Sequence, residues 1–446
     1  MHLMNFEETL SYLLSLGHET LAIKLGLRNT ELLLESLDAP QKAYESVQIA
    51  GTNGKGSTAV ILDSICRAAG IPTGVYTSPH LVSITERIRI DGREIDENRF
   101  AQYASEVRLA AEDLLAAGKI AALPTFFEHV TAIALLAFRE AGVKLAILET
   151  GLGGRLDATT VAQAGIIAIT PLALDHQEYL GETLEQIARE KAAIIRPGVT
   201  AIIAQQPPEA LAVIRQRCAE CNVQPDVESE QSRHRVAGAT NHGRCRVSFE
   251  TPEGRYENVQ LGLRGRHQIA NAAVAIRLAE SLRRRGFYIP QAAIIKGVEV
   301  ARHAGRLELH EGQPALLFDG AHNPSGAQAL LEFLEEFIKA PLTLVFGAMN
   351  DKKLGEMAAI LFPLADRLIL TQTDNPRAAG VDALQRAASQ IIDRKTILTA
   401  GSARDAFRLA REVTAADGMI CITGSLYLIG EIKAIIEAAA LSEVAG

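Results

Sequence analysis

Short apolar runs alternate along the chain with amphipathic stretches, and this alternation predicts the fold class. The predicted buried strands of the first half are residues 46–50, 145–149, 165–170 and 199–204. The predicted helices, with apolar residues at helical spacing, are 55–69, 100–117, 127–140 and 183–195. Alternation of this kind is typical of a parallel sheet with crossover helices. We therefore predict an α/β fold with a mostly parallel sheet in the N-terminal part.

Two segments break this pattern. Asp91-Gly92 lies between the extended runs 86–90 and 93–95, and an Asp-Gly pair in that place predicts a β-hairpin. Residues 205–262 carry many polar residues and only short strand-like pieces, and we predict a sheet edge with loops there. An Ala-rich helix is predicted after it, at about 267–285.

A second series of strands and helices begins near residue 303. Its predicted strands are 315–319, 342–347, 367–371 and 419–423. A chain of 446 residues is also too long for one ordinary core. We therefore predict two α/β domains: a mostly parallel N-terminal one over 1–302, and a smaller Rossmann-like one over 303–446.

The composition is that of a soluble globular protein, with 48% hydrophobic and 22% charged residues. A net charge of -8 gives no general affinity for nucleic acid. The first residues lack the basic region of a signal peptide, and no uncharged apolar run reaches membrane-spanning length. We expect a cytoplasmic protein without a membrane partner.

The five cysteines are scattered and do not predict a disulfide framework. Cys218 and Cys221 form a single C-x-x-C pair, with His234, His242 and Cys245 downstream. A zinc site is the minority interpretation, because no second ligand pair follows at a familiar spacing. Ordinary cysteines are favoured.

The strand that ends at Ala50 runs into the glycine-rich sequence GTNGKGST, residues 51–58, and then into a helix. Such a turn brings backbone N–H groups and a helix N-terminus to a phosphate. Lys55 would reach the β- and γ-phosphates, and Ser57 or Thr58 a metal ion or a phosphate oxygen. The sequence departs from G-x-x-x-x-G-K-[ST], and a turn that merely closes a corner is the alternative. The predicted nucleotide-binding residues are Thr52, Asn53, Gly54, Lys55, Gly56, Ser57 and Thr58.

Polar residues at two further strand ends predict a metal site. Glu149 ends an otherwise apolar strand, and Asp175-His176 follows another. Ligands bind at the carboxyl ends of strands in open α/β sheets, and oxygen ligands near a phosphate loop favour Mg²⁺. Either group taken alone is also explained as a capped strand end.

Lys191 lies on an apolar helix face. The residues that share this face are Leu184, Ile187, Ala188, Ile194 and Ile195. A half-buried lysine usually extends its amine to solvent or pairs with an acid. A deprotonated amine could instead react with CO₂, and the carbamate would be an acidic metal ligand.

Eight motifs together closely resemble the folylpolyglutamate synthase/dihydrofolate synthase family of the Mur-type ligases, over nearly the whole chain. They are GTNGKGST, TSPHL (77–81), ETGLGGRLDATT (149–160), ALDH (173–176), REKAAI (189–194), GRLE (305–308), DGAHNP (319–324) and TGSLYLIGE (423–431). The resemblance implies an ATP- and Mg²⁺-dependent ligase. Such an enzyme adds L-glutamate to the carboxylate of dihydropteroate, of a folylpolyglutamate, or of both, through an acyl phosphate. GLGGRLDAT resembles the bifunctional bacterial members.

The resemblance also implies roles for single residues. The phosphate loop, including Lys55, would hold the ATP phosphates. Three further residues would contact ATP: Asn271, Arg306 and Asp319. The ligands of two Mg²⁺ ions would be Ser78, Glu149, His176 and a carbamylated Lys191. The residues linked to glutamate would be His322 and Ser425. The pterin pocket would contain Lys24, Leu25, Phe127, Asp157 and Ala158. Lys55, Lys191 and His322 are the predicted catalytic residues.

Several of these positions also have a plain structural explanation. Ser425 follows a strand and opens a helix, so it is predicted to be an N-cap whose helix terminus suits a carboxylate. His322 precedes Asn-Pro, which favours a turn, and Asn271 can serve helix packing. Lys24, where some bifunctional members carry an acid, and Thr160, where DATN is usual, bear on substrate preference only.

Two alternative functions remain open at this point. A Mur-type ligase for a cell-wall precursor would share the ATP chemistry, but such ligases usually carry a separate nucleotide-sugar domain before the phosphate loop. This chain reaches that loop by residue 51. A nucleotide switch would bind or hydrolyse ATP without regard to glutamate. We expect a monomer that binds only small molecules, and a requirement for K⁺ stays open.

Overall fold

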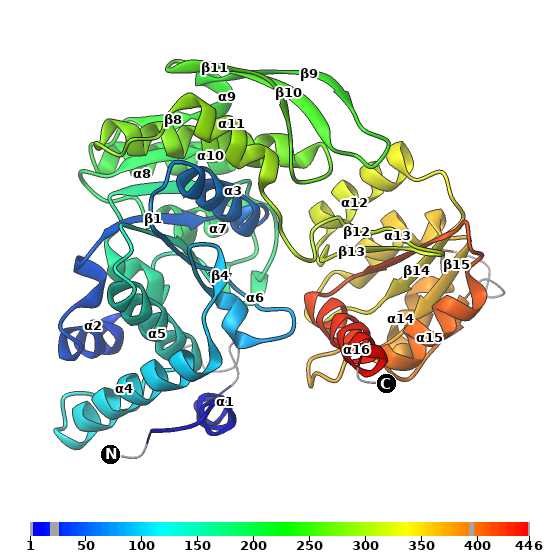
Figure 1. The fold of residues 1–446 in the computed structure, drawn as a ribbon, viewed down its shortest axis with the longest axis horizontal. Helices are drawn as coiled ribbons and strands as arrows, with labels where there is room; N and C mark the ends of the chain where they lie inside the picture. The colour runs from blue at the N-terminus through cyan, green and yellow to red at the C-terminus, as the bar shows by residue number, and fades with distance from the viewer. Residues whose placement is uncertain (1–2, 18–25, 392–396, 445–446) are drawn as a thin grey trace.

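The computed structural model describes residues 3–17, 26–391 and 397–444, and it contains two α/β lobes (Figure 1). The larger lobe is built on an eight-stranded sheet of order β4-β3-β2-β5-β1-β6-β7-β8. Its strands are β1 (Glu45–Ala50), β2 (Thr73–Tyr76), β3 (Ile88–Ile90), β4 (Arg93–Glu94), β5 (Leu145–Glu149), β6 (Ile166–Ile169), β7 (Thr200–Ile203) and β8 (Pro225–Val227). All neighbours are parallel except the two pairs that involve β3. The four predicted strands and the hairpin are confirmed.

Helices cover both faces of this sheet, which is why its strands read as continuous apolar runs. In β5, Leu145 and Ile147 pack toward one face, whereas Ala146 and Leu148 pack toward the other. The first face is covered by α3 (Lys55–Ala68), α10 (His267–Arg284) and α11 (Gln291–Val300). The second face is covered by α4 (Glu97–Ala116), α5 (Phe126–Glu140), α7 (Leu184–Ala192) and α8 (Pro208–Glu220).

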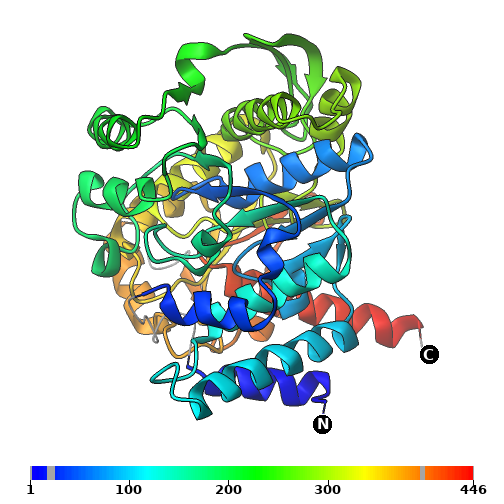
Figure 2. The same ribbon diagram turned by 90° about the vertical axis from the view of Figure 1, so that its left-hand side faces the viewer.

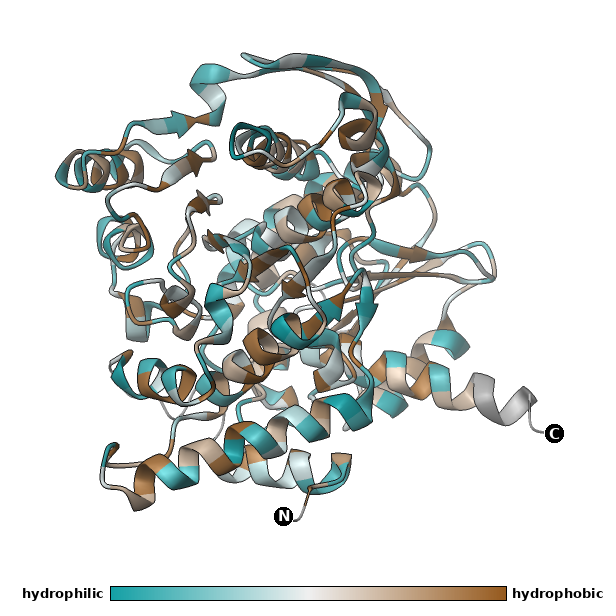
Figure 3. Ribbon diagram, turned by 60° about the vertical axis from the view of Figure 1, so that its left-hand side comes forward, coloured by the Kyte–Doolittle hydropathy of each residue, from teal (hydrophilic) through white to brown (hydrophobic). Residues whose placement is uncertain are grey.

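Helices α1 (Phe6–Ser15) and α2 (Arg28–Ser36) pack outside α4 and α5 (Figure 2). Polar and apolar residues alternate along the helices in Figure 3, and the buried residues of α4 include Phe100, Ala104 and Val107. Side-chain caps fix several helix starts; the Thr125 and Glu128 capping box begins α5. Helix α7 begins as predicted but ends at Ala192, before Arg196-Pro197, where a proline disfavours helical backbone. None of the helices in the described residues is long and apolar enough to cross a membrane.

The prediction for residues 205–262 was wrong in part. Only β8 joins the edge of the large sheet, and α8 is a regular helix. A separate antiparallel sheet of order β11-β10-β9 packs over α10 and α11 (Figure 1). Its strands are β9 (Arg233–Ala239), β10 (Cys245–Thr251) and β11 (Gly254–Gln260). Only the inward face of this sheet is apolar, with Val247 and Phe249 in β10, so each strand carries a weak hydrophobic signal.

The cysteines behave as ordinary core residues. Cys218 and Cys221 are buried against α7, and the Cys221 thiol donates to the Ile195 carbonyl at 3.3 Å. Burial raises the pKa of the Cys218 thiol to about 11. His234 is exposed on β9, in a different sheet. The structure therefore gives the C-x-x-C pair a packing role rather than a zinc site.

The smaller lobe has a six-stranded sheet of order β12-β13-β17-β14-β15-β16, parallel except for the β12–β13 pair. Its strands are β12 (Glu308–His310), β13 (Ala315–Asp319), β14 (Leu342–Phe346), β15 (Arg367–Leu370), β16 (Ile397–Thr399) and β17 (Met419–Thr423). The helices on its two faces are α12 (Pro324–Phe337), α13 (Leu354–Leu361) and α14 (Val381–Ala388) on one, and α15 (Ala403–Val413) and α16 (Leu426–Val444) on the other. The four predicted strands are confirmed, and the short edge strands β12 and β16 were missed. The predicted domain junction at 302/303 falls between α11 and β12.

A buried ionic cluster joins the edge of the large sheet to α10. Arg277 forms ion pairs with Asp226 and Glu280, and Glu228 is buried beside them with 5% of its surface exposed. Burial, reinforced by Asp226 and opposed by Arg277, raises the pKa of Glu228 to about 7. The folded protein therefore holds a proton on Glu228 that the unfolded chain releases, and this contribution to stability is lost as the pH rises through 7.

Replacement of Glu228 by glutamine is expected to stabilise the protein at alkaline pH. The gain in unfolding free energy should be larger at about pH 8 than at about pH 5 by roughly 2 kcal/mol, because only the carboxylate must be buried charged. Urea unfolding of both proteins at the two pH values measures this difference. An equal effect at both pH values would contradict it.

Candidate active site

Loops from both lobes line one cavity of about 500 Å³. The larger lobe contributes the segments after β1, β5 and β6, and the smaller lobe those after β13, β17, β14 and β15. All of these segments follow the carboxyl ends of parallel strands, where open α/β sheets bind ligands. Eighteen of the predicted site residues line this cavity. They are Thr52, Asn53, Gly54, Lys55, Gly56, Ser57, Ser78, Phe127, Glu149, Asp157, Ala158, His176, Lys191, Asn271, Arg306, Asp319, His322 and Ser425.

The glycine-rich segment connects β1 directly to α3. Gly54 has a φ of +87°, and a Cβ atom there would lie 2.2 Å from Asn271 Oδ1, so only glycine fits beside α10. Lys55 begins α3, and its ammonium donates to the carbonyl oxygens of Gly51 at 3.2 Å and Thr52 at 3.3 Å. Ser57 lines the cavity, whereas Thr58 points into the core and does not. Of the two candidate hydroxyl residues, Ser57 therefore lines the cavity and Thr58 does not.

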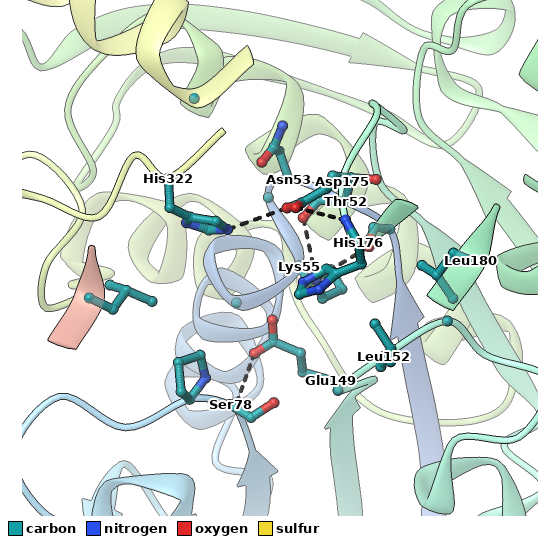
Figure 4. A pocket seen from close by; sticks show the side chains of 18 of the residues that line it. Thr52, Asn53, Lys55, Ser78, Glu149, Leu152, Asp175, His176, Leu180 and His322 are labelled. Atoms are coloured by element: carbon teal, nitrogen blue, oxygen red, sulfur yellow. Dashed lines mark hydrogen bonds and ion pairs between the residues drawn. The ribbon is translucent and has the colours of Figure 1, made fainter. Parts of the chain in front are cut away.

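The predicted metal ligands approach the same part of the cavity (Figure 4). Glu149 ends β5, and its carboxylate accepts the Ser78 N–H at 3.3 Å; Figure 4 shows it pointing toward Lys55 and His176. Burial raises the pKa of Glu149, and the Lys55 charge opposes that rise. Burial also lowers the pKa of His176 to about 4, so its imidazole is neutral at pH 7 and able to bind a cation.

The donor set fits Mg²⁺. Within the described residues, no three His, Cys, Asp or Glu side chains converge closely enough to hold a metal ion by themselves. Mg²⁺ is characteristically bound by one or two carboxylates together with substrate phosphates and water. Glu149, the Ser78 hydroxyl and His176 would therefore hold the ion jointly with a nucleotide.

Lys191 is buried as predicted, with 4% of its surface exposed. Its amine donates to the Gly51 carbonyl at 2.7 Å, below the phosphate loop. Burial, followed by the neighbouring charge of Lys55, lowers the pKa of Lys191 to about 7. A substantial fraction of this amine is consequently neutral at physiological pH, which is the form that reacts with CO₂.

The smaller lobe presents Asp319, His322 and Ser425. Asp319 ends β13 and accepts the N–H groups of Leu307 at 2.9 Å and Ala321 at 3.0 Å; burial raises its pKa, and Arg306 opposes that rise. The His322 Nδ1 lies 2.8 Å from the Gly320 carbonyl oxygen, which leaves Nε2 toward the cavity. The Ser425 hydroxyl accepts the Tyr427 N–H at 3.1 Å at the start of α16, so the predicted N-cap is confirmed.

The predicted pterin residues divide into three groups. Phe127 and Ala158 line the cavity, and the Phe127 ring lies 5.9 Å from that of Tyr76. Asp157 accepts the N–H groups of Gly151 at 2.8 Å and Leu152 at 3.0 Å, so its carboxylate fixes the loop after β5. Lys24 and Leu25 lie outside the described residues.

Sequence reasoning missed the contacts between the two lobes. Asp175 accepts hydrogen bonds from Lys352 at 2.7 Å and Asn323 at 3.1 Å, and His322 Nε2 lies 3.5 Å away (Figure 4 shows the His322 contact). Asn323 also donates to Asn53 in the phosphate loop at 3.1 Å. Burial would raise the pKa of Asp175, but His322 and Lys352 hold it well below its usual range. The Asn-Pro pair was interpreted as a turn, and nothing in the sequence singled out Lys352.

Replacement of Lys352 by methionine is expected to open the two lobes. Removal of one partner from a buried ion pair typically costs about 3–5 kcal/mol. Asp175 would keep its contacts with Asn323 and His322, so the cost here should lie near or below the lower end of that range. Small-angle scattering should show a larger radius of gyration than for the unaltered protein. Lys353→Met is the matched control, because among the described residues the ion-pair partner of Lys353 is Glu356, close by in the chain and in the same lobe. Identical scattering from both variants would contradict the prediction.

Each of the two lobes matches a different family of domains. Residues 49–279 match the Mur ligase middle domain, and residues 305–426 match the Mur ligase glutamate ligase domain. A phosphate loop in the first lobe that faces the strand ends of a second α/β lobe agrees with both matches. The chain is therefore a Mur-type ligase by fold and site.

Known relatives refine this class. The chain is 33% identical over 434 residues to the Bacillus subtilis dihydrofolate synthase/folylpolyglutamate synthase. This match covers 94% of this chain and 96% of the relative. It belongs to the folylpolyglutamate synthase/dihydrofolate synthase family of the Mur ligases. A Halobacterium salinarum protein named probable bifunctional folylpolyglutamate synthase/dihydropteroate synthase is 36% identical over 431 residues, 96% of this chain. The chain spans 51% of that protein's length.

Solved structures of related enzymes have the same fold. A Mycobacterium tuberculosis folylpolyglutamate synthase complexed with ADP matches with a TM-score of 0.89 at 31% identity, over 96% of this chain and 98% of the other. A bifunctional folylpolyglutamate synthase/dihydrofolate synthase with Mn, AMPPNP and L-glutamate bound matches with a TM-score of 0.84 at 28% identity, over 98% and 100%. These findings favour the folate family over the cell-wall ligase and the nucleotide switch.

Proposed function

We propose that this chain is an ATP-dependent ligase that joins L-glutamate to the carboxylate of dihydropteroate, of tetrahydrofolate and its polyglutamates, or of both. The observation that carries the proposal is the shared cavity. It is lined on one side by the phosphate loop and on the other by Asp319, His322 and Ser425. A carboxylate, a nucleotide and an amino acid can meet there.

The first step joins two anions, because the substrate carboxylate must attack the γ-phosphate. Lys55 and the N-terminus of α3 lower this repulsion from one side. Ser78, Glu149 and His176 would hold Mg²⁺, with a carbamylated Lys191 as a further anionic ligand. The positive charge of Mg²⁺ would neutralise the phosphate oxygens. The carboxylate oxygen then bonds to phosphorus while the β–γ bridge breaks, and an acyl phosphate and ADP result.

The second step is attack by the glutamate amine on the acyl carbon, with inorganic phosphate as the leaving group. His322 and the Ser425 end of α16 are proposed to hold the amino acid, since a helix N-terminus suits a carboxylate. Asn271, Arg306 and Asp319 are proposed to contact ATP, and Phe127 and Ala158 the pterin ring. Catalysis is mainly positioning and charge stabilisation, so no nucleophilic side chain is required.

The relatives support this assignment. The solved structure of one bifunctional relative has Mn, AMPPNP and L-glutamate bound, so that protein binds a nucleotide, a divalent metal ion and the amino acid. We further propose that this chain has both activities, works as a monomer in the cytoplasm on small molecules, and divides into domains at residues 302/303.

The deciding experiment is Mg·ATP turnover by the purified chain with glutamate, in which dihydropteroate is compared with tetrahydrofolate. ADP release that requires both glutamate and a pterin substrate is the expected result. Turnover with both pterins would establish two activities. ATP turnover that ignores glutamate and pterin would overturn the proposal and favour a nucleotide switch.

A further inference from the structure

The linker between the two lobes carries a histidine into the cavity. Helix α11 ends at Val300 and β12 begins at Glu308, so residues 301–307 join the lobes. His303, in this linker, lines the cavity beside the phosphate loop. A Cβ atom added at Gly56 would lie 2.9 Å from the His303 Cε1 atom and 3.3 Å from its Nε2 atom. The mechanism proposed above gives this side chain no role.

One ring nitrogen of His303 is fixed by a buried hydrogen-bond network. Its Nδ1 lies 3.2 Å from the hydroxyl oxygen of Ser57. The Gln268 amide group donates to the same hydroxyl at 3.3 Å, and its nitrogen also lies 3.1 Å from His267 Nε2. The Asn271 amide donates to the Gln268 side-chain oxygen at 2.8 Å. Ser57, Gln268 and Asn271 each expose 4% or less of their surface, so the network holds these groups in one arrangement.

This network determines which ring nitrogen carries the proton. A hydroxyl group has a single O–H and accepts through its lone pairs. Because Ser57 accepts from Gln268, its own proton can be donated to His303 Nδ1. Burial, followed by the charges of Arg306 and Arg89, lowers the pKa of His303 to about 3, so the ring is neutral at pH 7. The one ring proton therefore lies on Nε2, which is a hydrogen-bond donor.

The Nε2–H group of His303 has no protein acceptor in the part of the chain that the structure describes. It lies next to the phosphate loop, opposite the proposed metal ligand Glu149. The Cβ position of Gly56 would be 3.3 Å from His303 Nε2 and also 3.3 Å from Glu149 Oε2. A carboxylate on one side of the loop can bind a cation, while an N–H group on the other side can bind an anionic oxygen.

A nucleotide phosphate chain with its Mg²⁺ ion matches this pair of groups. Lys55 and the metal ion already bring positive charge to the loop, and a further cation would be repelled by both. A neutral imidazole avoids this repulsion and still donates a hydrogen bond. Its ring is also positioned before the ligand arrives, so binding costs little side-chain entropy.

We propose that His303 is a further nucleotide-binding residue, whose Nε2–H donates to a phosphate oxygen of Mg·ATP while Ser57 holds the ring in that tautomer. This inference rests on the proposed function. It adds to that function a phosphate contact from the linker between the lobes.

Two substitutions separate the two ring nitrogens. His303→Asn keeps a polar group near the position of Nδ1, whereas His303→Gln keeps an N–H donor near the position of Nε2. Isothermal titration calorimetry with Mg·AMPPNP measures the affinity without turnover. His303→Asn and His303→Ala are expected to raise Kd by roughly 10-fold, because a hydrogen bond to a charged group is lost. His303→Gln should recover most of this affinity. His242→Asn, at an exposed position outside the cavity, is the control.

A second ligand locates the contact. Mg·tripolyphosphate has neither base nor sugar, so its affinity for His303→Asn should fall by the same factor. A loss confined to Mg·AMPPNP would place the contact on the base or the sugar and overturn the inference.

The remaining outcomes are equally distinct. Normal Mg·AMPPNP binding by all three variants, with thermal melting that shows them folded, would overturn the inference and leave the proposed function standing. Normal binding by His303→Asn together with weak binding by His303→Gln would also overturn it, because His303 would then act only by positioning Ser57. If the unaltered chain does not bind Mg·AMPPNP, the proposed function itself fails, and the inference fails with it.

Discussion

Replacement of Lys55 by methionine is expected to lower kcat by roughly 10³-fold, since one preorganised charge on a developing anion contributes about that much. Lys55 opens α3 next to Gly54, and its ammonium now rests on the Gly51 and Thr52 carbonyls. These carbonyls hold the amine over the loop, where it lines the cavity at the proposed site of the nucleotide phosphates. The effect should fall on the phosphoryl transfer step, where negative charge increases.

Initial rates of ADP release at saturating substrates would measure this loss. Lys296→Met is the matched control, because it removes the same group from an exposed position on α11. Thermal melting should be nearly unchanged for both variants, because the two hydrogen bonds that Lys55 makes within the described residues are long, at 3.2 and 3.3 Å. A Lys55→Met variant with near-normal turnover would remove the phosphate loop from the mechanism.

Replacement of Lys191 by methionine is also expected to abolish most turnover, while the fold persists. Its amine is buried below the loop, 2.7 Å from the Gly51 carbonyl, and has a pKa lowered by burial to about 7. A neutral amine can form a bond to the carbon of CO₂ and release one proton, which leaves a carbamate beside Glu149 and His176. Loss of this anionic carbamate ligand would weaken metal binding, so kcat should fall by roughly 10²-fold or more.

Two measurements separate the carbamate from a simple packing role. Protein held in carbon-13-labelled bicarbonate should show a carbamate signal that is absent from Lys191→Met. CO₂-depleted buffer should lower the activity of the unaltered protein, and bicarbonate should restore it. A fully active protein without a carbamate signal would contradict this prediction.

Stability provides an independent check on Lys191. Because its folded pKa lies below the unfolded value of 10.5, the folded state releases a proton that the unfolded chain keeps. The lysine therefore destabilises the protein most below pH 7, and this penalty fades as the pH rises toward 10.5. Lys191→Met should raise the unfolding free energy by about 3 kcal/mol near pH 6 and by much less near pH 10. The inactive variant would then be more stable than the active protein.

The sequence by itself determined the strands and helices that carry the site. Strands buried on both faces must be apolar throughout, so β1, β5, β13 and β17 were evident as short runs. The polar residue at the carboxyl end of β5 marked Glu149. Helical periodicity placed Lys191 on a buried face, and a serine between a strand and a helix predicted the Ser425 cap. These signals are local, within a few residues of each group.

Only the tertiary structure decided which of these ends meet. Asp175 pairs with Lys352, 177 residues away along the chain, and Asn323 reaches Asn53 across 270 residues. No period or cap encodes such a pair, because the contact depends on how two separate sheets face each other. The same holds for the antiparallel sheet over α10 and α11, whose strands have only one apolar face.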